Sequence, residues 1–241
     1  MILAAGRGER MRPLTDTTPK PLLSVRGKPL IDWHVEALAR GGFTSLVINT
    51  AWLGPQIEAH FSRPSDPQPN AHLREALSIS YSHEGNDFGG ALETAGGIAR
   101  ALPLLGDVFW VLAGDVFVPG FAFSQAAVDR FSASGKLAHL WLVPNPPHNP
   151  AGDFGLSAGG LALNLAAGAN APRLTFSTIA LYRRTLFDTL PFGNPQGAKA
   201  PLAPLLRRAM DNGQVSAELY RGAWTDVGTP ARLSELNETS L

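Results

Sequence analysis

The feature that most constrains the fold is a glycine-containing segment close to the start of the chain. The apolar residues 1–4 run directly into Gly6-Arg7-Gly8-Glu9-Arg10, and Pro19-Lys20-Pro21-Leu22 follows a few residues later. A short buried strand that ends in such a loop is typical of α/β proteins, which bind ligands at the carboxyl edge of a parallel sheet. The segment therefore predicts a strand, then a binding loop, within an α/β fold.

The residue types of this loop favour a polyphosphate ligand. Gly6 and Gly8 allow backbone N–H groups to approach phosphate oxygens closely. Arg10 and Lys20 bring mobile positive charge to the same anion. We expect the Lys20 side chain to be exposed, so that its removal changes activity far more than stability.

Other interpretations of the loop fit less well. A glycine-rich strand-to-helix turn with solvated charges does not account for the length of the patterned segment. The dinucleotide-binding pattern fails because Met11 stands where its third glycine belongs. The Walker pattern fails because no Gly-Lys-Ser/Thr sequence follows.

Along the first half of the chain, segments whose apolar residues have the spacing of a strand alternate with segments whose apolar residues have the spacing of a helix. The predicted strands are 1–4, 46–48, 79–82 and 108–112, and the predicted helices are 29–40, 55–61 and 94–102. Such alternation predicts a mainly parallel sheet covered by helices on both faces. Residues 62–70 are rich in Pro, Ser and Asp, so we expect a surface connection there.

The second half is less regular. It contains predicted strands at 137–143, 174–181 and 215–219, predicted helices at 202–210 and 230–241, and a loop rich in Pro and Asn at 145–153. We find no internal repeat, and in particular no hexapeptide repeat of the kind that forms a β-helix.

Composition excludes several classes of function. Lys plus Arg and Asp plus Glu number 20 each, so no overall charge attracts nucleic acid or an anionic membrane. The chain has no cysteine, which excludes disulfides, thiolate catalysis and Cys-ligated metals. No apolar stretch approaches the roughly 20 residues that cross a bilayer, and residues 1–6 are too short for a signal peptide core. We therefore expect a cytoplasmic protein, a monomer or a small homo-oligomer.

The same segments resemble the sugar-1-phosphate nucleotidyltransferases. That family carries Leu-x-x-Gly-x-Gly-x-Arg followed by Pro-Lys-Pro, as residues 3–10 and 19–21 do here. Residues 92–97 are similar to its nucleobase and sugar loop, Gly114-Asp115 to its metal-binding pair, and residues 224–229 to its second metal segment. The resemblance implies a three-layer α/β/α, Rossmann-like nucleotidyltransferase fold with a mainly parallel mixed sheet. It also implies one domain over 1–241, with a nucleotide-binding half at 1–115 and a sugar-phosphate-binding half at 116–241.

Within the family, the N-acetylmuramate-1-phosphate uridylyltransferase branch is the most similar. The similarity lies in Ala51-Trp52-Leu53-Gly54, in Leu174-Thr175-Phe176-Ser177 and in residues 202–207. Three features depart from that branch: Thr178 replaces an expected glycine, Ala91 replaces an expected proline, and residues 86–90 resemble a small insertion. All three fall near the predicted substrate pocket.

The resemblance implies roles for residues at matching positions. The implied catalytic residues are Arg10, Lys20 and Asp115. The implied nucleotide-binding residues are Leu3, Ala4, Ala5, Gly6, Gly8, Thr94 and Gly97. The implied substrate-binding residues are Glu93, Asp153, Phe176, Ser177 and Lys199.

Asp115 and Asp226 are the candidate metal ligands. Asp115 follows a predicted central strand at the edge where the first loop lies, although an aspartate there is often a helix cap or a turn residue. Asp226 precedes Gly228 in an aromatic-flanked segment. Two carboxylates together with phosphate oxygens and water suit Mg²⁺, which rarely has an all-protein cage.

These parts predict transfer of a nucleotide to a sugar 1-phosphate, with release of pyrophosphate. The sugar 1-phosphate is already an anion, so no protein nucleophile is required, and catalysis depends on positioning and charge neutralisation. Residues 145–155 lack the Glu-Lys-Pro triplet usual in relatives that use glucose 1-phosphate or mannose 1-phosphate. Its loss leaves room for a bulkier sugar that carries a carboxylate. We therefore expect UTP and N-acetylmuramate 1-phosphate as substrates, in cell-wall recycling.

Several alternatives stay open. The chain could be a mannose-1-phosphate guanylyltransferase, or a glucose-1-phosphate thymidylyl- or uridylyltransferase that contacts its sugar from elsewhere. It could be a nucleotide-binding regulatory subunit without catalysis, although Arg10, Lys20, Asp115 and Asp226 are all present. A glycosyltransferase fits less well, because Gly114-Asp115-Val116-Phe117 is not an Asp-x-Asp motif.

Overall fold

The computed structural model describes residues 1–62, 76–166 and 168–238, and the predicted connection at 62–70 falls almost entirely outside them. The chain forms two compact units whose segments alternate along the sequence. The first unit comprises residues 1–92, 113–125 and 223–241, and the second unit comprises residues 93–112 and 126–222. The functional division of a single domain at residue 115 stays a prediction.

The first unit contains a parallel three-stranded sheet. Strand β1 (Ile2–Leu3) pairs with β4 (Ser45–Thr50), which pairs with β5 (Ser78–His83). β4 is almost wholly buried, as expected for the centre of a parallel sheet that is covered on both faces. The helices of this unit are α1 (Leu14–Thr17), α2 (Leu30–Arg40), α3 (Gly54–Ser62), α5 (Glu84–Phe88) and α9 (Pro230–Glu238), with 3₁₀ turns η1 (Glu9–Met11) and η2 (Lys20–Leu22).

Two short ladders complete the first unit, and the second of them joins segments that are distant in sequence. β2 (Ser24–Val25) pairs with β3 (Lys28–Pro29), and β7 (Val116–Phe117) pairs with β13 (Thr225–Asp226), both antiparallel. A buried apolar cluster lies beside them, formed by Met11, Leu23, Val25, Leu30, Phe117, Val227 and Leu233. This cluster packs the end of the glycine loop together with the segments that flank Asp115 and Asp226.

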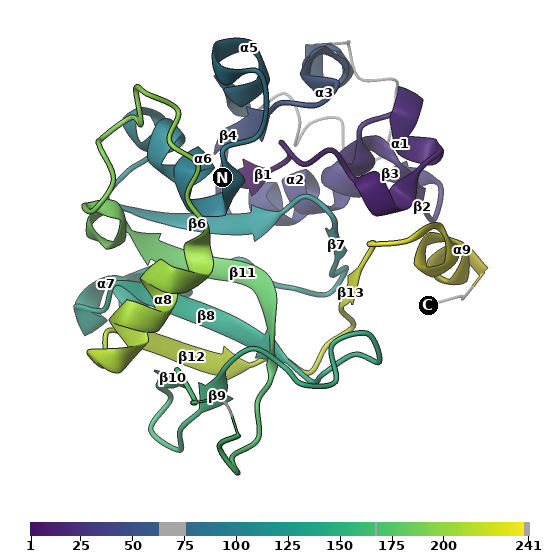
Figure 1. The fold of residues 1–241 in the computed structure, drawn as a ribbon. Helices are drawn as coiled ribbons and strands as arrows, with labels where there is room; N and C mark the ends of the chain where they lie inside the picture. Colours follow the sequence, from purple (N-terminus) through teal and green to yellow (C-terminus); the bar gives the residue numbers. More distant parts are fainter. Residues whose placement is uncertain (63–75, 167, 239–241) are drawn as a thin grey trace. The chain divides into compact units, whose positions relative to one another are not determined.

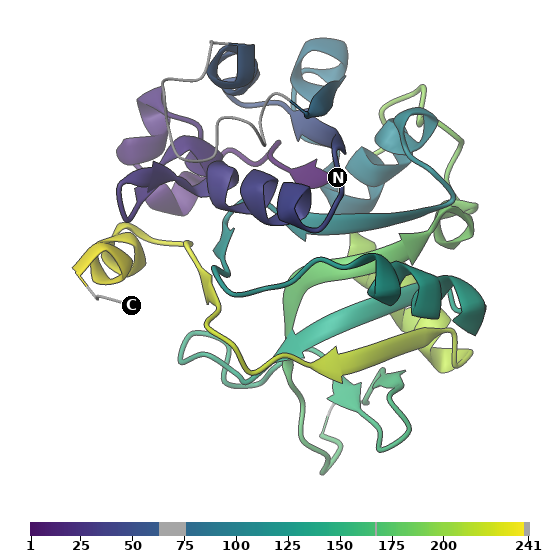
Figure 2. The same cartoon turned by 180° about the vertical axis from the view of Figure 1, so that it is seen from behind.

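The second unit contains a mixed four-stranded sheet in the order β12-β8-β11-β6. Its strands are β6 (Val108–Ala113), β8 (Ala138–Val143), β11 (Thr175–Arg183) and β12 (Val215–Leu219). β11 runs antiparallel to both neighbours, whereas β12 is parallel to β8. Helix α8 (Leu202–Asp211) lies on one face of this sheet and α7 (Gln125–Ser134) on the other (Figures 1 and 2). The unit is completed by α6 (Glu93–Ala101), η3 (Leu102–Leu104), η4 (Arg184–Phe187) and the hairpin of β9 (Gly155–Leu156) and β10 (Ala162–Leu163).

Each strand or helix that the sequence predicts has a counterpart whose ends differ by at most a few residues, and the last three residues of the predicted helix 230–241 lie outside the described residues. The sequence did not predict α7 or the β9–β10 hairpin. Residues 86–90, interpreted as an insertion, overlap the short helix α5. Among the described residues, no helix has both the length and the apolar character needed to cross a membrane.

Strand β11 contains a bulge at Thr178. The pairing of β11 with β8 shifts register between Phe176 and Ala180. Thr178 has φ +66°, in the left-handed region where a β-branched residue is strained. Its hydroxyl donates a hydrogen bond to the Ser177 carbonyl. The glycine expected at this position would adopt the same backbone conformation without strain.

We predict that Thr178→Gly is more stable than Thr178→Ala by about 1 kcal/mol, because only alanine keeps a Cβ in the left-handed region. At an ordinary strand position the alanine variant would be the more stable of the two, since glycine loses more backbone entropy on folding. Urea unfolding of both variants, which equally lack the hydroxyl, measures the difference. An alanine variant as stable as the glycine variant would show that the bulge is not strained.

Candidate active site

The glycine loop takes its shape from backbone contacts within the first unit. The Gly8 carbonyl accepts hydrogen bonds from the Met11 N–H (2.8 Å) and the Thr15 hydroxyl (2.9 Å). Gly8 has φ +68°, and a Cβ added there would lie 3.1 Å from Thr15 Cγ2. A Cβ on Gly6, in contrast, would meet no atom within 4 Å. Gly8 is therefore required by the fold of the loop, whereas the space beside Gly6 is open to a ligand.

Gly114 brings Asp115 beside this loop. The Gly114 N–H donates to the Leu3 carbonyl at 2.8 Å, and a Cβ on Gly114 would lie only 2.9 Å from that oxygen. Glycine alone permits this approach. The Asp115 carboxylate then meets Lys20, whose Nζ lies 2.5 Å from Asp115 Oδ2.

The exposure predicted for Lys20 is wrong. Lys20 is only 8 % exposed, because η2 turns its side chain toward Asp115 rather than into solvent. The ammonium group has three donors, and the pair with Asp115 Oδ2 uses one of them. Removal of Lys20 would leave Asp115 without this partner, so it would also affect stability.

Asp226 lies next to Asp115 in the backbone pairing. Asp226 is the register partner of Val116, and the Val227 N–H donates to the Asp115 carbonyl at 2.8 Å. The Asp226 carboxylate forms a short ion pair with Arg232 of α9. A Cβ on Gly228 would lie 2.8 Å from Asp226 Oδ2, so this glycine leaves room for the pair.

The two aspartates fit a divalent cation that shares its coordination with a ligand. Among the residues that the structure describes, no group of three or more His, Cys, Asp or Glu side chains could hold a metal by itself. Asp115 retains a side chain that is 40 % exposed, so solvent and ions can reach it. Each carboxylate has several acceptor positions and can bind a cation beside its lysine or arginine partner. This donor set suits a metal such as Mg²⁺ that takes most of its ligands from phosphate and water.

Arg10 is the other cation of the loop. Its side chain is exposed on η1 and forms no ion pair or hydrogen bond within the described parts of the chain. A guanidinium that is not already paired can bind an anionic ligand without first breaking an internal contact.

A buried network that no sequence pattern indicates supports the end of β1. The Ala4 N–H donates to Asn49 Oδ1 (2.8 Å), and Asn49 Nδ2 donates to Glu84 Oε1 (2.5 Å). Glu84 Oε2 accepts the Leu92 N–H at 2.7 Å. Burial raises the pKa of the Glu84 carboxyl, while its hydrogen bonds with Leu92 and Asn49 lower it in part. The predicted nucleotide-binding role of Ala4 is thus limited to groups other than its N–H.

In the second unit, the loop before α8 is joined to the first turn of α6, where the predicted residues Glu93, Thr94 and Gly97 lie. The Ala200 carbonyl accepts the N–H groups of Ala95 (2.9 Å) and Gly96 (3.0 Å). Buried Asn194 links Gly96 to Ala198 through its side-chain amide. Lys199 lies within this loop with an exposed side chain.

Two residues that were predicted to contact the substrate use their side chains in hydrogen bonds within the second unit. Ser177 is fully buried, and its hydroxyl donates to the Trp141 carbonyl at 2.7 Å. Asp153 Oδ2 accepts the Phe176 N–H at 2.8 Å. These contacts favour a structural role for Ser177 in the bulge. They favour a role for Asp153 in positioning Phe176. Phe176 itself is half-buried.

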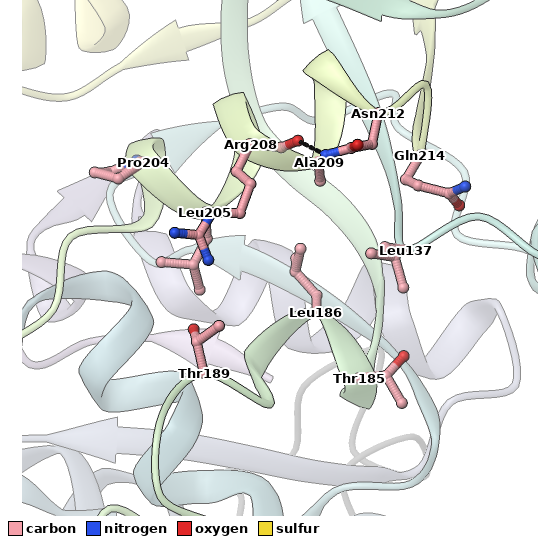
Figure 3. Close-up of a pocket in the computed structure, with 10 residues that line it drawn as sticks. All are labelled: Leu137, Thr185, Leu186, Thr189, Pro204, Leu205, Arg208, Ala209, Asn212 and Gln214. Carbon is pink, nitrogen blue, oxygen red and sulfur yellow. Dashed lines mark hydrogen bonds between the residues drawn. The ribbon is translucent and has the colours of Figure 1, made fainter.

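A surface pocket of about 430 Å³ also lies in the second unit. It is lined by Leu137, Thr185, Leu186, Thr189, Pro204, Leu205, Arg208, Ala209, Asn212 and Gln214 (Figure 3). None of the predicted site residues contributes to this lining, so the pocket is not the candidate active site.

Comparison with known proteins identifies the family. A family model described as nucleotidyl transferase matches residues 1–162. The chain belongs to the nucleotidyl transferase family. The sequence is 49 % identical to N-acetylmuramate alpha-1-phosphate uridylyltransferase of Neisseria meningitidis, over 98 % of this chain and 95 % of that protein. It is 32 % identical to the Caulobacter vibrioides protein of the same name, over 98 % and 96 %.

A solved structure shows the same fold. The structure of apo UDP-glucose pyrophosphorylase superposes with a TM-score of 0.73 at 17 % identity, over 98 % of this chain and 96 % of that chain. The resemblance found in the sequence is thereby confirmed, as is the mixed-sheet α/β nucleotidyltransferase fold that it implied. The role of each site residue in this nucleotidyl transferase stays a prediction.

The two loop glycines should respond differently to alanine. We expect Gly8→Ala to lower stability by about 1 kcal/mol, because φ is positive and Thr15 is close. Gly6→Ala should keep wild-type stability but weaken nucleotide binding, because its Cβ occupies the space beside the loop. Thermal unfolding and calorimetric titration with UTP and Mg²⁺ separate the two effects. Equal losses of stability would contradict the assignment.

His34 predicts a pH dependence of stability. This side chain on α2 is fully buried, and desolvation lowers its pKa to about 4, although a hydrogen bond to the Val116 backbone and the charge of Asp115 oppose the shift. A lowered pKa in the folded state means that the unfolded chain binds the proton more tightly. Stability is therefore complete above the ordinary histidine pKa and falls as the pH drops through about 4.

The expected loss by pH 4 is on the order of 3 kcal/mol relative to neutral pH. His34→Asn should flatten this dependence, since it keeps a hydrogen-bond donor near Nδ1 but does not titrate. Urea unfolding of both proteins from pH 7 to pH 4, without divalent cations, gives the comparison. Parallel pH curves would exclude His34 as the cause.

Proposed function

We propose that this nucleotidyl transferase joins N-acetylmuramate 1-phosphate to UTP and releases UDP-N-acetylmuramate and pyrophosphate. The observation that carries the proposal is the 49 % identity to the Neisseria uridylyltransferase across nearly the whole of both chains. The mannose-1-phosphate guanylyltransferase relatives, such as that of Xenopus tropicalis, match only about half of this chain at 34 % identity. The proposed product belongs to cell-wall recycling, and a cytoplasmic setting stays a prediction.

The proposed mechanism relies on positioning within the first unit. A phosphate oxygen of the sugar 1-phosphate attacks the α-phosphorus of UTP, the bond between the α- and β-phosphates breaks, and pyrophosphate leaves. Arg10 binds the β- and γ-phosphates through the guanidinium that has no internal partner in the described structure. Lys20 orients Asp115 through one donor and keeps its others for phosphate oxygens. Neither residue transfers a proton, since the attacking and leaving groups are both anions.

Asp115 and Asp226 would hold the divalent cation, which we propose to be Mg²⁺. Bound there, it would neutralise phosphate charge and favour attack at the α-phosphorus. Arg232 holds Asp226 from one side, so that the carboxylate keeps its place on β13 before any cation arrives. Lys20 holds the Asp115 carboxylate in place in the same way.

The second unit supplies the proposed sugar contacts. In residues 145–155, Asn149 donates to Asp153 and Thr175, and Asp153 accepts the Phe176 N–H, so the loop is held by its own polar groups. The loop also contains no lysine or glutamate that could contact a sugar. Lys199 is exposed and can bind the lactyl carboxylate of the substrate, and Phe176 can cover the apolar side of the sugar ring.

The direct test is to follow pyrophosphate release with UTP and each sugar 1-phosphate, and then with GTP and thymidine triphosphate. We expect the highest kcat/KM for UTP with N-acetylmuramate 1-phosphate. Efficient use of glucose or mannose 1-phosphate alone would refute the substrate but keep the reaction class. Nucleotide binding without turnover of any sugar 1-phosphate would instead indicate a regulatory subunit.

Asp115→Asn should lower kcat by two orders of magnitude or more, because an amide binds a divalent cation far more weakly than a carboxylate. The fold should be kept, since the amide oxygen can still accept from Lys20 and the side chain is partly exposed. Excess chelator should abolish wild-type activity. Full activity of the variant in chelator would rule out the metal role.

A further inference from the structure

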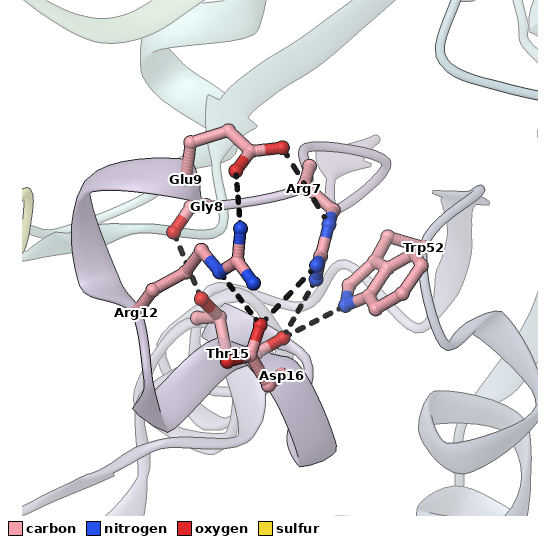
Figure 4. Close-up of polar contacts among 7 residues, drawn as sticks. All are labelled: Arg7, Gly8, Glu9, Arg12, Thr15, Asp16 and Trp52. Atoms are coloured by element: carbon pink, nitrogen blue, oxygen red, sulfur yellow. Dashed lines mark hydrogen bonds and ion pairs between the residues drawn. The ribbon is translucent and has the colours of Figure 1, made fainter.

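Arg7, which no step of the proposed mechanism uses, is held by four partners (Figure 4). Its guanidinium carbon lies 3.4 Å from the centre of the Trp52 ring. Nη1 donates to the Thr15 carbonyl at 3.0 Å, Nη2 pairs with Asp16 at 3.2 Å, and Nε lies 3.5 Å from Glu9. Each of the three guanidinium nitrogens and one face of the group are thus engaged within the protein.

Trp52 is fixed to the same place. Its indole N–H donates to the Thr15 carbonyl at 2.9 Å, so Arg7 and Trp52 share one acceptor. Trp52 belongs to the segment Ala51-Trp52-Leu53-Gly54, which follows β4. The contact therefore joins the glycine loop, the first turns after it and the end of β4, three parts of the first unit that meet only through folding.

The charges of this cluster balance. Arg7 and Arg12 face Glu9 and Asp16, with Arg12 Nε lying 2.8 Å from Asp16. A triphosphate that bound Arg7 would have to break these ion pairs. It would also have to remove the guanidinium from the face of the indole, where the cation–π interaction is worth roughly 1 kcal/mol or more. Arg10, one turn further on, carries no such contacts among the described residues. Arg7 is therefore held by internal contacts, whereas the Arg10 guanidinium is available to a ligand.

We propose that Arg7 is a positioning residue, which holds the glycine loop in its binding shape by stacking on Trp52, and that it does not itself contact phosphate. The inference rests on the proposed function only for the identity of the nucleotide. Pre-ordering the loop lowers the entropic cost of binding the triphosphate. Loss of the stack should thus weaken nucleotide affinity and leave the chemical step nearly intact once nucleotide is saturating.

The experiment compares matched variants of the full chain by calorimetric titration with two probes, UTP with Mg²⁺ and inorganic triphosphate with Mg²⁺. We expect Arg7→Ala and Trp52→Leu each to raise Kd for both probes by about tenfold, which corresponds to about 1.4 kcal/mol. Trp52→Phe keeps an aromatic face and should stay within about threefold of wild type. The control is Arg12→Ala, which removes an arginine that shares Asp16 but lies off the Trp52 ring, and it should change Kd less than twofold.

Two further readouts separate positioning from a general loss of structure. In the double variant Arg7→Ala/Trp52→Leu, the two effects should not add, because both remove the same contact. With sugar 1-phosphate present, Arg7→Ala should raise KM for UTP while kcat stays within about threefold, whereas Arg10→Ala should lower kcat. Circular dichroism and thermal unfolding establish that each variant is folded.

Three results would overturn the proposal. Additive effects of the two substitutions would show that the stack carries no coupling. A fall in kcat of Arg7→Ala at unchanged KM would place Arg7 on the reacting phosphates. Failure of the wild type to bind either probe would remove the loop as a triphosphate site. Binding of UTP without turnover of N-acetylmuramate 1-phosphate would refute the proposed function alone, since the titrations test Arg7 independently of catalysis.

Discussion

The arrangement of the candidate active site depends on one close backbone contact. The hydrogen bond from Gly114 to the Leu3 carbonyl leaves no room for a side chain, so within the first unit it brings the backbone of Gly114 directly against the end of β1. Asp115 follows immediately and therefore meets Lys20. The Val227 N–H bonds to the Asp115 carbonyl, which adds Asp226 to the same group. A bulkier residue at position 114 would disturb all three candidate site side chains at once.

Around this contact, positive and negative charges are matched almost one to one. Lys20 faces Asp115, Arg232 faces Asp226, and Arg7 with Arg12 faces Glu9 with Asp16. Such a surface holds neither a bare anion nor a bare cation strongly, because each incoming charge competes with an internal pair. A nucleotide and a divalent cation that arrive together bring both signs, and they can satisfy lysine and aspartate at the same time. In the proposed function, the pairing would thus favour the metal–nucleotide complex over either part.

How much of this the sequence predicts depends on whether a residue acts through its local pattern or through distant partners. The strands, the main helices and the glycine loop follow from apolar spacing and from glycines in sequence order, and they were found. The burial of Lys20 was not predicted, because it results from the turn of η2 toward Asp115, which lies 95 residues away in the sequence. Asn49, Glu84 and Asn194 were missed for the same reason: single polar residues carry no periodic signal, and their roles arise only when folding supplies partners. The strand at β11 was predicted within a mixed sheet, but its antiparallel direction was not assigned, although the lack of a helical pattern between β8 and β11 is consistent with it.

Substrate choice in this family cannot be derived from the fold itself. UDP-glucose pyrophosphorylase shares the fold at a TM-score of 0.73 with only 17 % identity, so the fold by itself does not identify the sugar that this chain would use. Two local features of the second unit, where we propose the sugar contacts, are unusual in physical terms. Thr178 holds a strained backbone where glycine would be relaxed, and the Asp153 carboxylate orients the backbone of Phe176. Backbone strain persists only where surrounding contacts enforce it, and it concentrates at functional sites. The bulge of β11 is therefore a candidate for shaping the proposed sugar site, because Phe176 lies beside it on the same strand.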